Sequence, residues 1–252
     1  KFRQLRDIRL DDAGWRDTHT ERVLPFTPLT SSGWQDFPAL NDLMPWGSPG
    51  IKANRSWVCS PSAETLRRRW ARLVREADPA DKSALFKETR DRDLSSRREP
   101  LPGLPNRPRT VGNETDTHPE LARVSLRSFD RQWLIADNRV LDRPRPDLWA
   151  ADQPDQLFLN QQSSHEIDSG PAAVATHLIP DTHHFNGRGG RVMPLLHPDG
   201  SPNLPAGLLS HLSRSTGTGP VSAADLAAYI VAVTAHSAFT EHFAEELLTP
   251  GV

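Results

Sequence analysis

The stretch Ala122-Arg-Val-Ser-Leu-Arg-Ser-Phe-Asp-Arg-Gln-Trp-Leu-Ile-Ala136 decides the fold class of this 252-residue chain. Its apolar residues gather on both sides of a break at Asp130, a pattern that predicts β structure in two parts. Other short apolar runs bounded by Pro, Gly or Asp are further strand candidates. They are Leu157–Leu159, Ala173–Ile179 and Arg191–Leu196. We interpret these segments together as an irregular β-sheet core.

Helical patterns flank these strands on both sides. After Ser62, an expected N-cap, apolar residues recur at helical spacing to about Ala77. The remaining predicted helices are Asp81–Asp93, Pro205–Leu212, Ala223–Ala235 capped by Ser222, and Phe239–Leu248. The last two would form a C-terminal helical pair. Helices around an irregular sheet predict a mixed α+β fold.

The length of the chain and the positions of its prolines and other breaking residues suggest how it is divided into domains. Residues 1–22 are interpreted as a connecting segment from a preceding domain, and residues 23–252 as the main domain. A basic helical subdomain over residues 50–110 is an open option within it. Val23–Leu29, interrupted by two prolines, is at best an edge strand, and residues 95–120 form a long Pro-rich loop. Because the chain begins with Lys1, we expect an excised part of a longer protein.

Composition excludes several protein classes. No apolar run is long enough for a transmembrane helix, and no export signal is visible in the first residues. A single cysteine, Cys59, rules out an internal disulfide and a cysteine-based zinc site. We therefore expect a cytoplasmic protein without membrane contact.

The formal net charge of −2 hides an uneven distribution. Residues 1–110 hold 21 basic and 15 acidic residues, a net of +6, while residues 111–252 hold 9 and 17, a net of −8. Arginine outnumbers lysine 26 to 4. A GC-rich genome explains this bias equally well, but arginine forks also suit phosphates and guanine edges.

Two basic features stand in the first half. Gly50-Ile-Lys-Ala-Asn-Arg-Ser-Trp-Val58 places Lys52, Asn54 and Arg55 on a short loop, where they are candidates for phosphate and base-edge contacts. The alternative is a polar loop that leads into a core strand. Further along, three arginines share one face of the helix predicted after Ser62 and can follow a phosphate backbone. They are Arg68, Arg72 and Arg75. Most such stripes are simply solvated helix faces.

The second half contributes further candidate contacts. In Ser128-Phe-Asp-Arg-Gln-Trp133, the two aromatic residues Phe129 and Trp133 are predicted core anchors, and Asp130 can pair with Arg131. In Leu141-Asp-Arg-Pro-Arg-Pro-Asp147, prolines would present two arginines rigidly. Other candidates for DNA contact lie directly before or after predicted strands. The candidate DNA-contact residues of the second half are Arg131, Arg143, Arg145, Gln161, Arg188 and Arg191. The alternatives to DNA contact are a loop held by ion pairs to nearby acidic residues, an ordinary polar loop and a hairpin turn.

Catalytic signals are weak. His177, Asp181, His183 and His184 have side chains suited to zinc or iron, but their spacing matches no ligand pattern. The chain contains no GxSxG, HExxH or CxxC motif, and its glycine-rich stretch Asn186-Gly-Arg-Gly-Gly-Arg191 has neither Walker nor dinucleotide-binding spacing.

Taken in order, several segments resemble the C-terminal specificity domain of Type ISP restriction-modification enzymes, a group of adenine-specific DNA methyltransferases. Gly50-Ile-Lys-Ala-Asn-Arg resembles its "SGIKTxRD" segment, Ser128-Phe-Asp-Arg-Gln-Trp133 its "RPFDxRW" element, and Leu141-Asp-Arg-Pro-Arg-Pro-Asp-Leu148 its "xxRPRPEL" element. Val192-Met-Pro-Leu-Leu196 resembles "FPLYL", and residues 224–239 resemble the closing "DLLAYIYAVLHSPAY" helix. Ala53, Ser56 and Ser128 depart from the usual residues of that family.

The resemblance implies a non-catalytic fragment that reads a target sequence in double-stranded DNA. In that family a neighbouring methyltransferase domain carries an NPPY-type motif, uses S-adenosylmethionine and flips the target adenine out of the duplex. This chain has no such motif, so we expect no cofactor within it. Two alternatives remain: a docking domain that joins the methyltransferase to other subunits through the terminal helices, and a metal-dependent hydrolase that uses the histidine cluster.

Overall fold

The computed structural model describes residues 33–163, 165–167, 169–185, 189–217 and 219–248. The chain divides into two compact units, Lys1–Pro38 and Ala39–Val252. In the first unit, the described part contains the short 3-10 helix η1 (Trp34–Asp36). The predicted connecting segment 1–22 and edge strand Val23–Leu29 lie outside the described residues. Everything below concerns the second unit.

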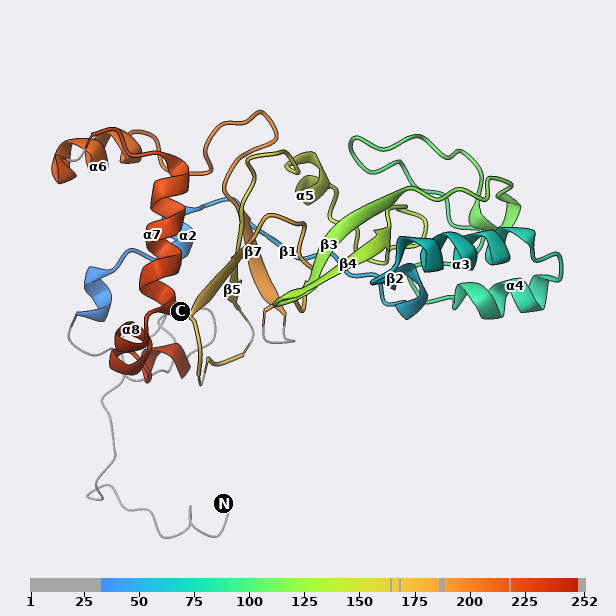
Figure 1. The fold of residues 1–252 in the computed structure, drawn as a ribbon, viewed down its shortest axis with the longest axis horizontal. Coiled ribbons are helices and arrows are strands. Elements are labelled where there is room, and N and C mark those ends of the chain that lie inside the picture. Colours follow the sequence, from blue (N-terminus) through green and yellow to red (C-terminus); the bar gives the residue numbers. More distant parts are fainter. Residues whose placement is uncertain (1–32, 164, 168, 186–188, 218, 249–252) are drawn as a thin grey trace, which may run out of the picture. The chain divides into compact units, whose positions relative to one another are not determined.

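Two antiparallel sheets organise this unit (Figure 1). The larger has the strand order β1-β7-β5-β6 and the smaller the order β2-β4-β3. Their bounds are β1 Ser48–Pro49, β2 Cys59–Ser60, β3 Leu121–Arg127, β4 Asp130–Ile135, β5 Phe158–Gln162, β6 Ala173–Thr176 and β7 Gly190–Pro194. The α+β prediction is confirmed, and the single irregular sheet that we expected is two separate sheets.

Helices lie between and after these strands. The α-helices are α2 Leu40–Leu43, α3 Ala63–Arg75, α4 Pro79–Phe86, α5 Pro146–Ala150, α6 Leu208–Thr216, α7 Ala223–Ala235 and α8 Ser237–His242. Short 3-10 turns are η2 Ser56–Val58, η3 Val111–Asn113 and η4 Glu246–Leu248. Within the described residues, no helix is both long and apolar enough to span a membrane.

Local capping explains where the best-predicted helices begin. The Ser62 hydroxyl accepts a hydrogen bond from the Thr65 amide at the start of α3. At α7, Ser222 and Asp225 form a reciprocal capping box. Both predicted helices are confirmed, and α7 has the predicted bounds.

Three helix predictions are wrong in extent. The short helix expected over Pro205–Leu212 is α6, which begins at Leu208 and ends at Thr216. The helix expected over Asp81–Asp93 is α4, which begins two residues earlier because Asp78 caps it, and it ends at Phe86, where Lys87 takes a left-handed φ of 56°. The helix expected over Phe239–Leu248 is interrupted, because α8 ends at His242 and the chain resumes as η4. The paired arrangement holds, since α7 and α8 are in contact.

The two hydrophobic cores meet at the larger sheet. Phe158 and Val192 belong to a core that continues under α3 to Trp70. Their strand neighbours Leu159 and Met193 point to the other face and pack in a second core with Ile230 of α7. Strand β5 is thus buried on both faces. Gln161, which we expected after the strand Leu157–Leu159, belongs to β5 itself and is buried, as are its neighbours Asn160 and Gln162.

The hairpin of β3 and β4 corrects one prediction about the core. Trp133 packs against the first core as expected, and Arg123 lies over its ring at 5.1 Å. Phe129 was expected to be a second core anchor, but its side chain is fully exposed, with a relative exposure of 104%. The reason is its position in the two-residue connection between Arg127 and Asp130, where the side chain points away from both strands.

Candidate nucleic-acid interface

Four distant segments meet where the two sheets approach each other, and we call their meeting place the seam (residues 50–55, 125–131, 141–145 and 179–184). Ile51 exchanges backbone hydrogen bonds with Pro180 and Thr182 at 3.0 and 2.7 Å, and Lys52 with Arg143 at 2.8 and 2.9 Å. Ser125 of β3 joins the same array by bonding Ile179 and Asp181. The seam therefore places the GIKANR, SFDRQW and LDRPRPD motifs side by side.

Gly50 permits this close approach. A Cβ atom at Gly50 would lie 2.5 Å from the carbonyl carbon of Asp181, a distance that side chains do not tolerate. The glycine is needed for its missing side chain, which lets two backbones pack directly against each other.

A buried ion pair fixes two of the seam segments. Arg55 Nη1 lies 2.6 Å from Asp142 Oδ1, and the two side chains are 0% and 1% exposed. The Arg55 guanidinium also donates to the carbonyls of Lys87, Arg92 and Val140. In this conformation Arg55 is buried and fully engaged, so it holds the loop in place, and its expected contact with DNA stays a prediction.

Asp142 holds Asn54 as well. Asn54 Nδ2 donates to Asp142 Oδ2 at 2.7 Å, and the Asn54 backbone is left-handed with a φ of 57°. Burial acts to raise the pKa of Asp142, but hydrogen bonds from Asn54, Arg55 and Thr89 outweigh it, so the pKa lies below its usual value. Asn54 is exposed and held in one place, as a residue that reads base edges requires.

The predicted Pro-rich arginine pair is present, but its members differ. Arg143 is 44% exposed and pairs with Asp91 at 3.2 Å. Arg145 is half-buried with a left-handed φ of 56°, and its Nε atom is buried without a hydrogen-bond partner. Desolvation and then the nearby Arg143 charge lower the pKa of Arg145. An oxygen ligand that accepts a hydrogen bond from this guanidinium would therefore bind favourably.

Lys52 and Arg131 supply further positive charge at the seam. Arg131 is exposed, and no acidic side chain in the described part of the chain pairs with it. The expected Asp130–Arg131 ion pair does not form, because Asp130 accepts a hydrogen bond from Gln132. Arg127, which we did not single out, pairs with Asp181 at 2.8 Å and remains 45% exposed.

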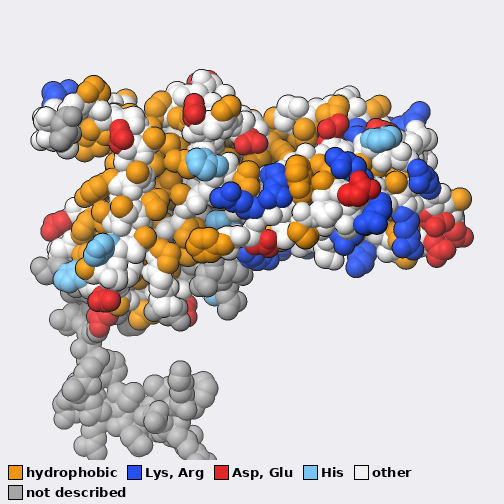
Figure 2. Space-filling view, viewed as in Figure 1, with side chains coloured by type: hydrophobic (Ala, Val, Ile, Leu, Met, Phe, Trp, Pro, Cys, Tyr) orange, Lys and Arg blue, Asp and Glu red, His pale blue; other side chains and the backbone are white. Residues whose placement is uncertain are grey.

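The arginine stripe of α3 forms a second basic region. Leu66, Trp70 and Leu73 face the core. The opposite face carries exposed arginines that have no acidic partner within the described residues, namely Arg68, Arg72 and Arg75. Figure 2 shows Lys and Arg side chains gathered over the elements from β3 to α3. No described hydrogen bond or ion pair connects this stripe with the seam.

The other expected contact residues lie along the central strands. Gln161 and Arg191 face each other across β5 and β7, where Gln161 is buried and Arg191 donates to the Pro45 carbonyl at 2.9 Å. In this conformation neither side chain is freely presented at the surface. Arg188 lies outside the described residues.

The histidine cluster does not assemble as a metal site. Asp181 is engaged by Arg127 and by His183, and His184 is buried. Burial and then the Arg127 charge lower the pKa of His184 to about 4, so its ring is neutral at pH 7. Among the described residues no group of three or more potential ligands is close enough to hold a metal ion.

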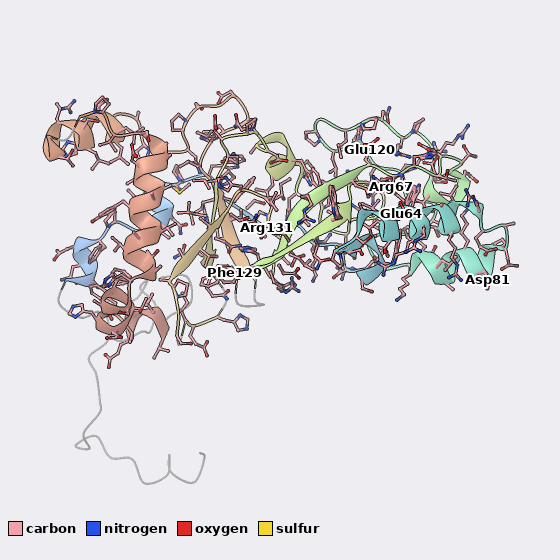
Figure 3. The ribbon with its side chains drawn as sticks, in the orientation of Figure 1. Glu64, Arg67, Asp81, Glu120, Phe129 and Arg131 are labelled. Atoms are coloured by element: carbon pink, nitrogen blue, oxygen red, sulfur yellow. The ribbon has the colours of Figure 1, made fainter. Side chains whose placement is uncertain are left out.

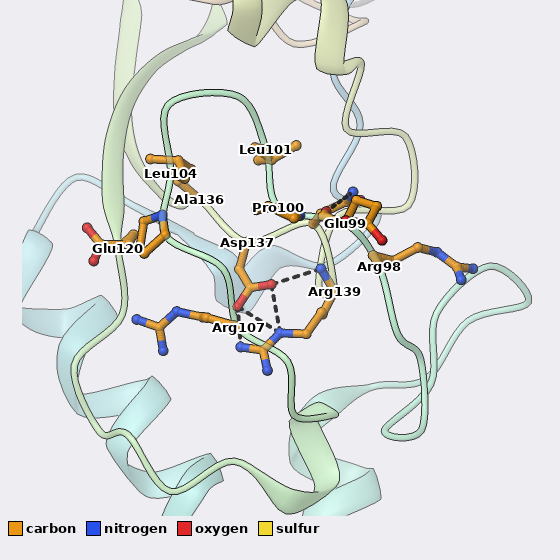
Figure 4. A pocket seen from close by; sticks show the side chains of 12 residues that line it. Arg98, Glu99, Pro100, Leu101, Leu104, Arg107, Glu120, Ala136, Asp137 and Arg139 are labelled. Carbon is orange, nitrogen blue, oxygen red and sulfur yellow. Dashed lines mark hydrogen bonds and ion pairs between the residues drawn. The ribbon is translucent and has the colours of Figure 1, made fainter.

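A shallow pocket lies under the Pro-rich loop and has a structural origin (Figure 4). On its floor Arg139 is 1% exposed and pairs with Asp137 at 2.6 Å and Glu114 at 2.9 Å. These contacts fasten the loop to the end of β4. Because the Arg139 guanidinium is fully engaged, it is not available to a ligand.

Comparison with known proteins identifies the family. The family model of the Type ISP C-terminal specificity domain matches residues 42–252. The chain belongs to this family. The matched range contains the whole seam and the α3 stripe, and it confirms the family resemblance derived from the motifs. A search of curated proteins found no match.

Solved structures share the fold of this specificity domain. The Type ISP enzyme LlaBIII bound to DNA matches with a TM-score of 0.57 at 14% identity, over 89% of this chain and 16% of that one. A nuclease-deletion mutant of the Type ISP enzyme LlaGI with a DNA substrate mimic gives 0.51 at 17%, over 88% and 18%. The DrdV–DNA complex gives 0.52 at 16%, over 82% and 21%. The chain thus spans about a fifth of their length.

Two features of the specificity domain escaped the sequence analysis. The Asp142 network joins Asn54, Arg55 and Thr89, residues far apart in sequence that only the fold brings together. The exposed Phe129 had a usable signal, because it directly precedes the break between two predicted strands. An apolar residue at such a break can be a turn residue as well as a core residue.

Proposed function

We propose that this specificity domain recognises a target sequence in double-stranded DNA and positions it for a separate catalytic domain, without itself catalysing a reaction. The observation that carries the proposal is the seam, where Lys52, Asn54, Arg131 and Arg143 are presented together on a rigid support. Membership of a specificity-domain family and a fold shared with DNA-bound enzymes support it.

The structure suggests a division of labour between the two basic regions. The α3 stripe, which is exposed, and Lys52, which is half-buried, would contact phosphates, because none of them has an acidic partner among the described residues. Asn54, Arg143 and Arg145 would read base edges, since their backbones are fixed by the seam. Arg55 and Gln161 would support these residues from below.

The catalytic partner would be an adenine methyltransferase domain of the same polypeptide or complex. We propose that this partner holds S-adenosylmethionine and flips the adenine, because the present chain carries no NPPY-type motif. A DNA target in a restriction-modification system would place this work in the cytoplasm.

Salt dependence tests the phosphate contacts. Each contact contributes about 0.9 to the slope of log affinity against log salt, so four contacts predict a loss of about a hundredfold between ~50 and ~200 mM salt. The variant R68A/R72A/R75A should lose only about fourfold over the same range. Fluorescence anisotropy with a labelled random-sequence duplex measures both.

The matched control is R67A, because Arg67 lies on the same helix but already pairs with Glu64 at 3.7 Å. Wild-type affinity that does not change with salt would refute the phosphate contacts. Selection from a random duplex pool then tests base reading, where R143A and N54A should change the selected sequence. If only the overall affinity falls, these residues contact phosphate.

One observation favours docking as a second function. The exposed face of α7 is apolar and carries Tyr229, which is 67% exposed. Its other exposed positions are Ala224, Ala228, Ala232 and Ala235, together with the capping residue Asp225 in the first turn. A neighbouring domain of the longer enzyme would cover this face. Tight binding of the catalytic domain without any DNA binding would favour docking over recognition.

A further inference from the structure

Phe129 occupies an unusual position for a large apolar residue. Figure 3 shows it at the tip of the β3–β4 hairpin, with Arg131 beside it. Its relative exposure of 104% means that no part of the ring packs against the protein. Trp70, Phe86 and Phe158, by contrast, are completely buried. The ring therefore contributes nothing to the core.

The backbone at the tip also disfavours this residue. Phe129 has a φ of 66° at the second position of a two-residue turn. Turns with positive φ at this position favour glycine or asparagine, because side chains with a Cβ are strained there. A phenylalanine that is both strained and exposed has no structural benefit, and such residues are typical of functional sites.

The hairpin tip is held firmly from behind. The Ser128 amide and hydroxyl both donate to the His184 carbonyl, at 2.9 and 3.1 Å. Arg127 is tied to Asp181 by the ion pair described above. These contacts fix the tip to the seam, so the ring is presented in one place and loses little freedom when it binds.

The charges beside the ring indicate what it meets. Arg131, two residues after Phe129, is exposed and has no acidic partner among the described residues, whereas Arg127 is held by Asp181. An apolar ring beside an exposed guanidinium group suits a DNA duplex, in which stacked bases lie between two phosphate strands. A protein pocket for phenylalanine would gain nothing from a cation beside it unless it were acidic.

We propose that Phe129 is a wedge that enters the base stack of the bound DNA, while Arg131 holds a phosphate beside it. The proposal rests on the proposed function and deepens it, because it assigns to the hairpin tip a part in deforming the duplex. Unstacking one base step would help the neighbouring domain to extract the target base.

A pre-opened duplex tests the wedge without knowledge of the target site. The probes are a short fluorescein-labelled duplex and the same duplex with one abasic site next to a 2-aminopurine. Because the gap removes the cost of unstacking, the wild-type chain should bind the abasic duplex about tenfold more tightly and quench the 2-aminopurine. F129A should lose both effects and keep its affinity for the intact duplex, while F129W should retain both.

The control variant is F37A, which removes another exposed aromatic ring and should behave as wild type. Unchanged thermal unfolding of F129A confirms that it is folded. If the wild type binds neither duplex, the proposed function fails. If the wild type binds both equally and without quenching, or F129A matches the wild type, DNA recognition stands and the wedge is refuted. The ring would then belong to a contact with protein.

Discussion

Removal of the Asp142 carboxylate should cost the protein a large part of its stability. Asp142 is the acidic partner of the buried Arg55 and also accepts hydrogen bonds from Asn54 and Thr89. Asp142→Ala leaves the Arg55 charge buried with only neutral partners, namely backbone carbonyls and the Thr89 hydroxyl. Because a buried charge is far less stable than a hydrated one, the folded state bears the whole penalty.

The expected loss is about 3–5 kcal/mol, the usual cost of breaking a buried ion pair from one side. This is a large fraction of the roughly 5–15 kcal/mol that stabilise a typical domain. Replacing both partners with apolar residues, as in R55M/D142L, removes the stranded charge. The double variant should lose only about 1–3 kcal/mol, because the carbonyls that Arg55 served become unsatisfied.

Urea unfolding measured by tryptophan fluorescence gives these free energies. The control is Asp155→Ala, an exposed aspartate whose loss should change stability by less than about 0.5 kcal/mol. The pKa of Asp142 is lowered by folding, so its contribution is present above the unfolded value of about 3.9 and is lost as pH falls through the folded value. The difference between wild type and D142A should therefore be constant near neutral pH and shrink below pH ~4.

If D142A loses less than about 1 kcal/mol of unfolding free energy, this reasoning is refuted, because an exposed ion pair contributes no more than that to stability. So would a double variant less stable than D142A alone. Either result would mean that Arg55 reaches solvent in the folded protein and is again a candidate for DNA contact.

Two further predictions concern the same seam. Gly50→Ala should destabilise the protein by about 1–3 kcal/mol in the same urea assay, because its Cβ would lie 2.5 Å from the Asp181 carbonyl carbon, and a cost below about 0.5 kcal/mol would contradict the close packing. His184 is neutral in the folded state, with its pKa lowered to about 4, whereas the unfolded ring takes up a proton near pH 6.5. Stability should be fully present above pH ~6.5 and fall as the pH approaches ~4, and H184Q should flatten this decline in urea midpoints measured across the range.

The sequence predicted those features that depend on neighbours in the chain. Helix α7 begins at its predicted residue because Ser222 and Asp225 satisfy each other locally. The break at Asp130 marked the hairpin, since alternating apolar runs do not continue through a tight turn. The start of α4 had a usable signal, Asp78 at the N-cap followed by Pro79, which the prediction missed, whereas its left-handed end at Lys87 has no strong sequence signal.

The site was less predictable, because burial is decided by distant partners. Asn54 and Arg55 are adjacent polar residues with the same apparent promise. Arg55 is buried because Asp142, 87 residues away, is placed to receive it, while Asn54 remains exposed on the other side of the same carboxylate. No local pattern distinguishes the two. For Phe129 the error was the opposite one, because burial was predicted and the residue is exposed. An aromatic residue is normally a core residue, and only the turn geometry exposes this one.

The unexpected burial of Arg55 and the unexpected exposure of Phe129 have a common explanation. A loop that binds DNA must already have its shape before the DNA arrives. Some of its charged residues therefore form ion pairs within the protein that hold the loop in place. Arg55 and Asp142 do this for the loop that carries Lys52 and Asn54, and Arg127 and Asp181 do it for the hairpin that carries Phe129. In both cases a charged pair supports the loop and an adjacent residue projects from it. We therefore expect the basic residues of this domain to divide into supporting and DNA-contacting groups, and the test of each is whether its loss lowers stability or only the affinity for DNA.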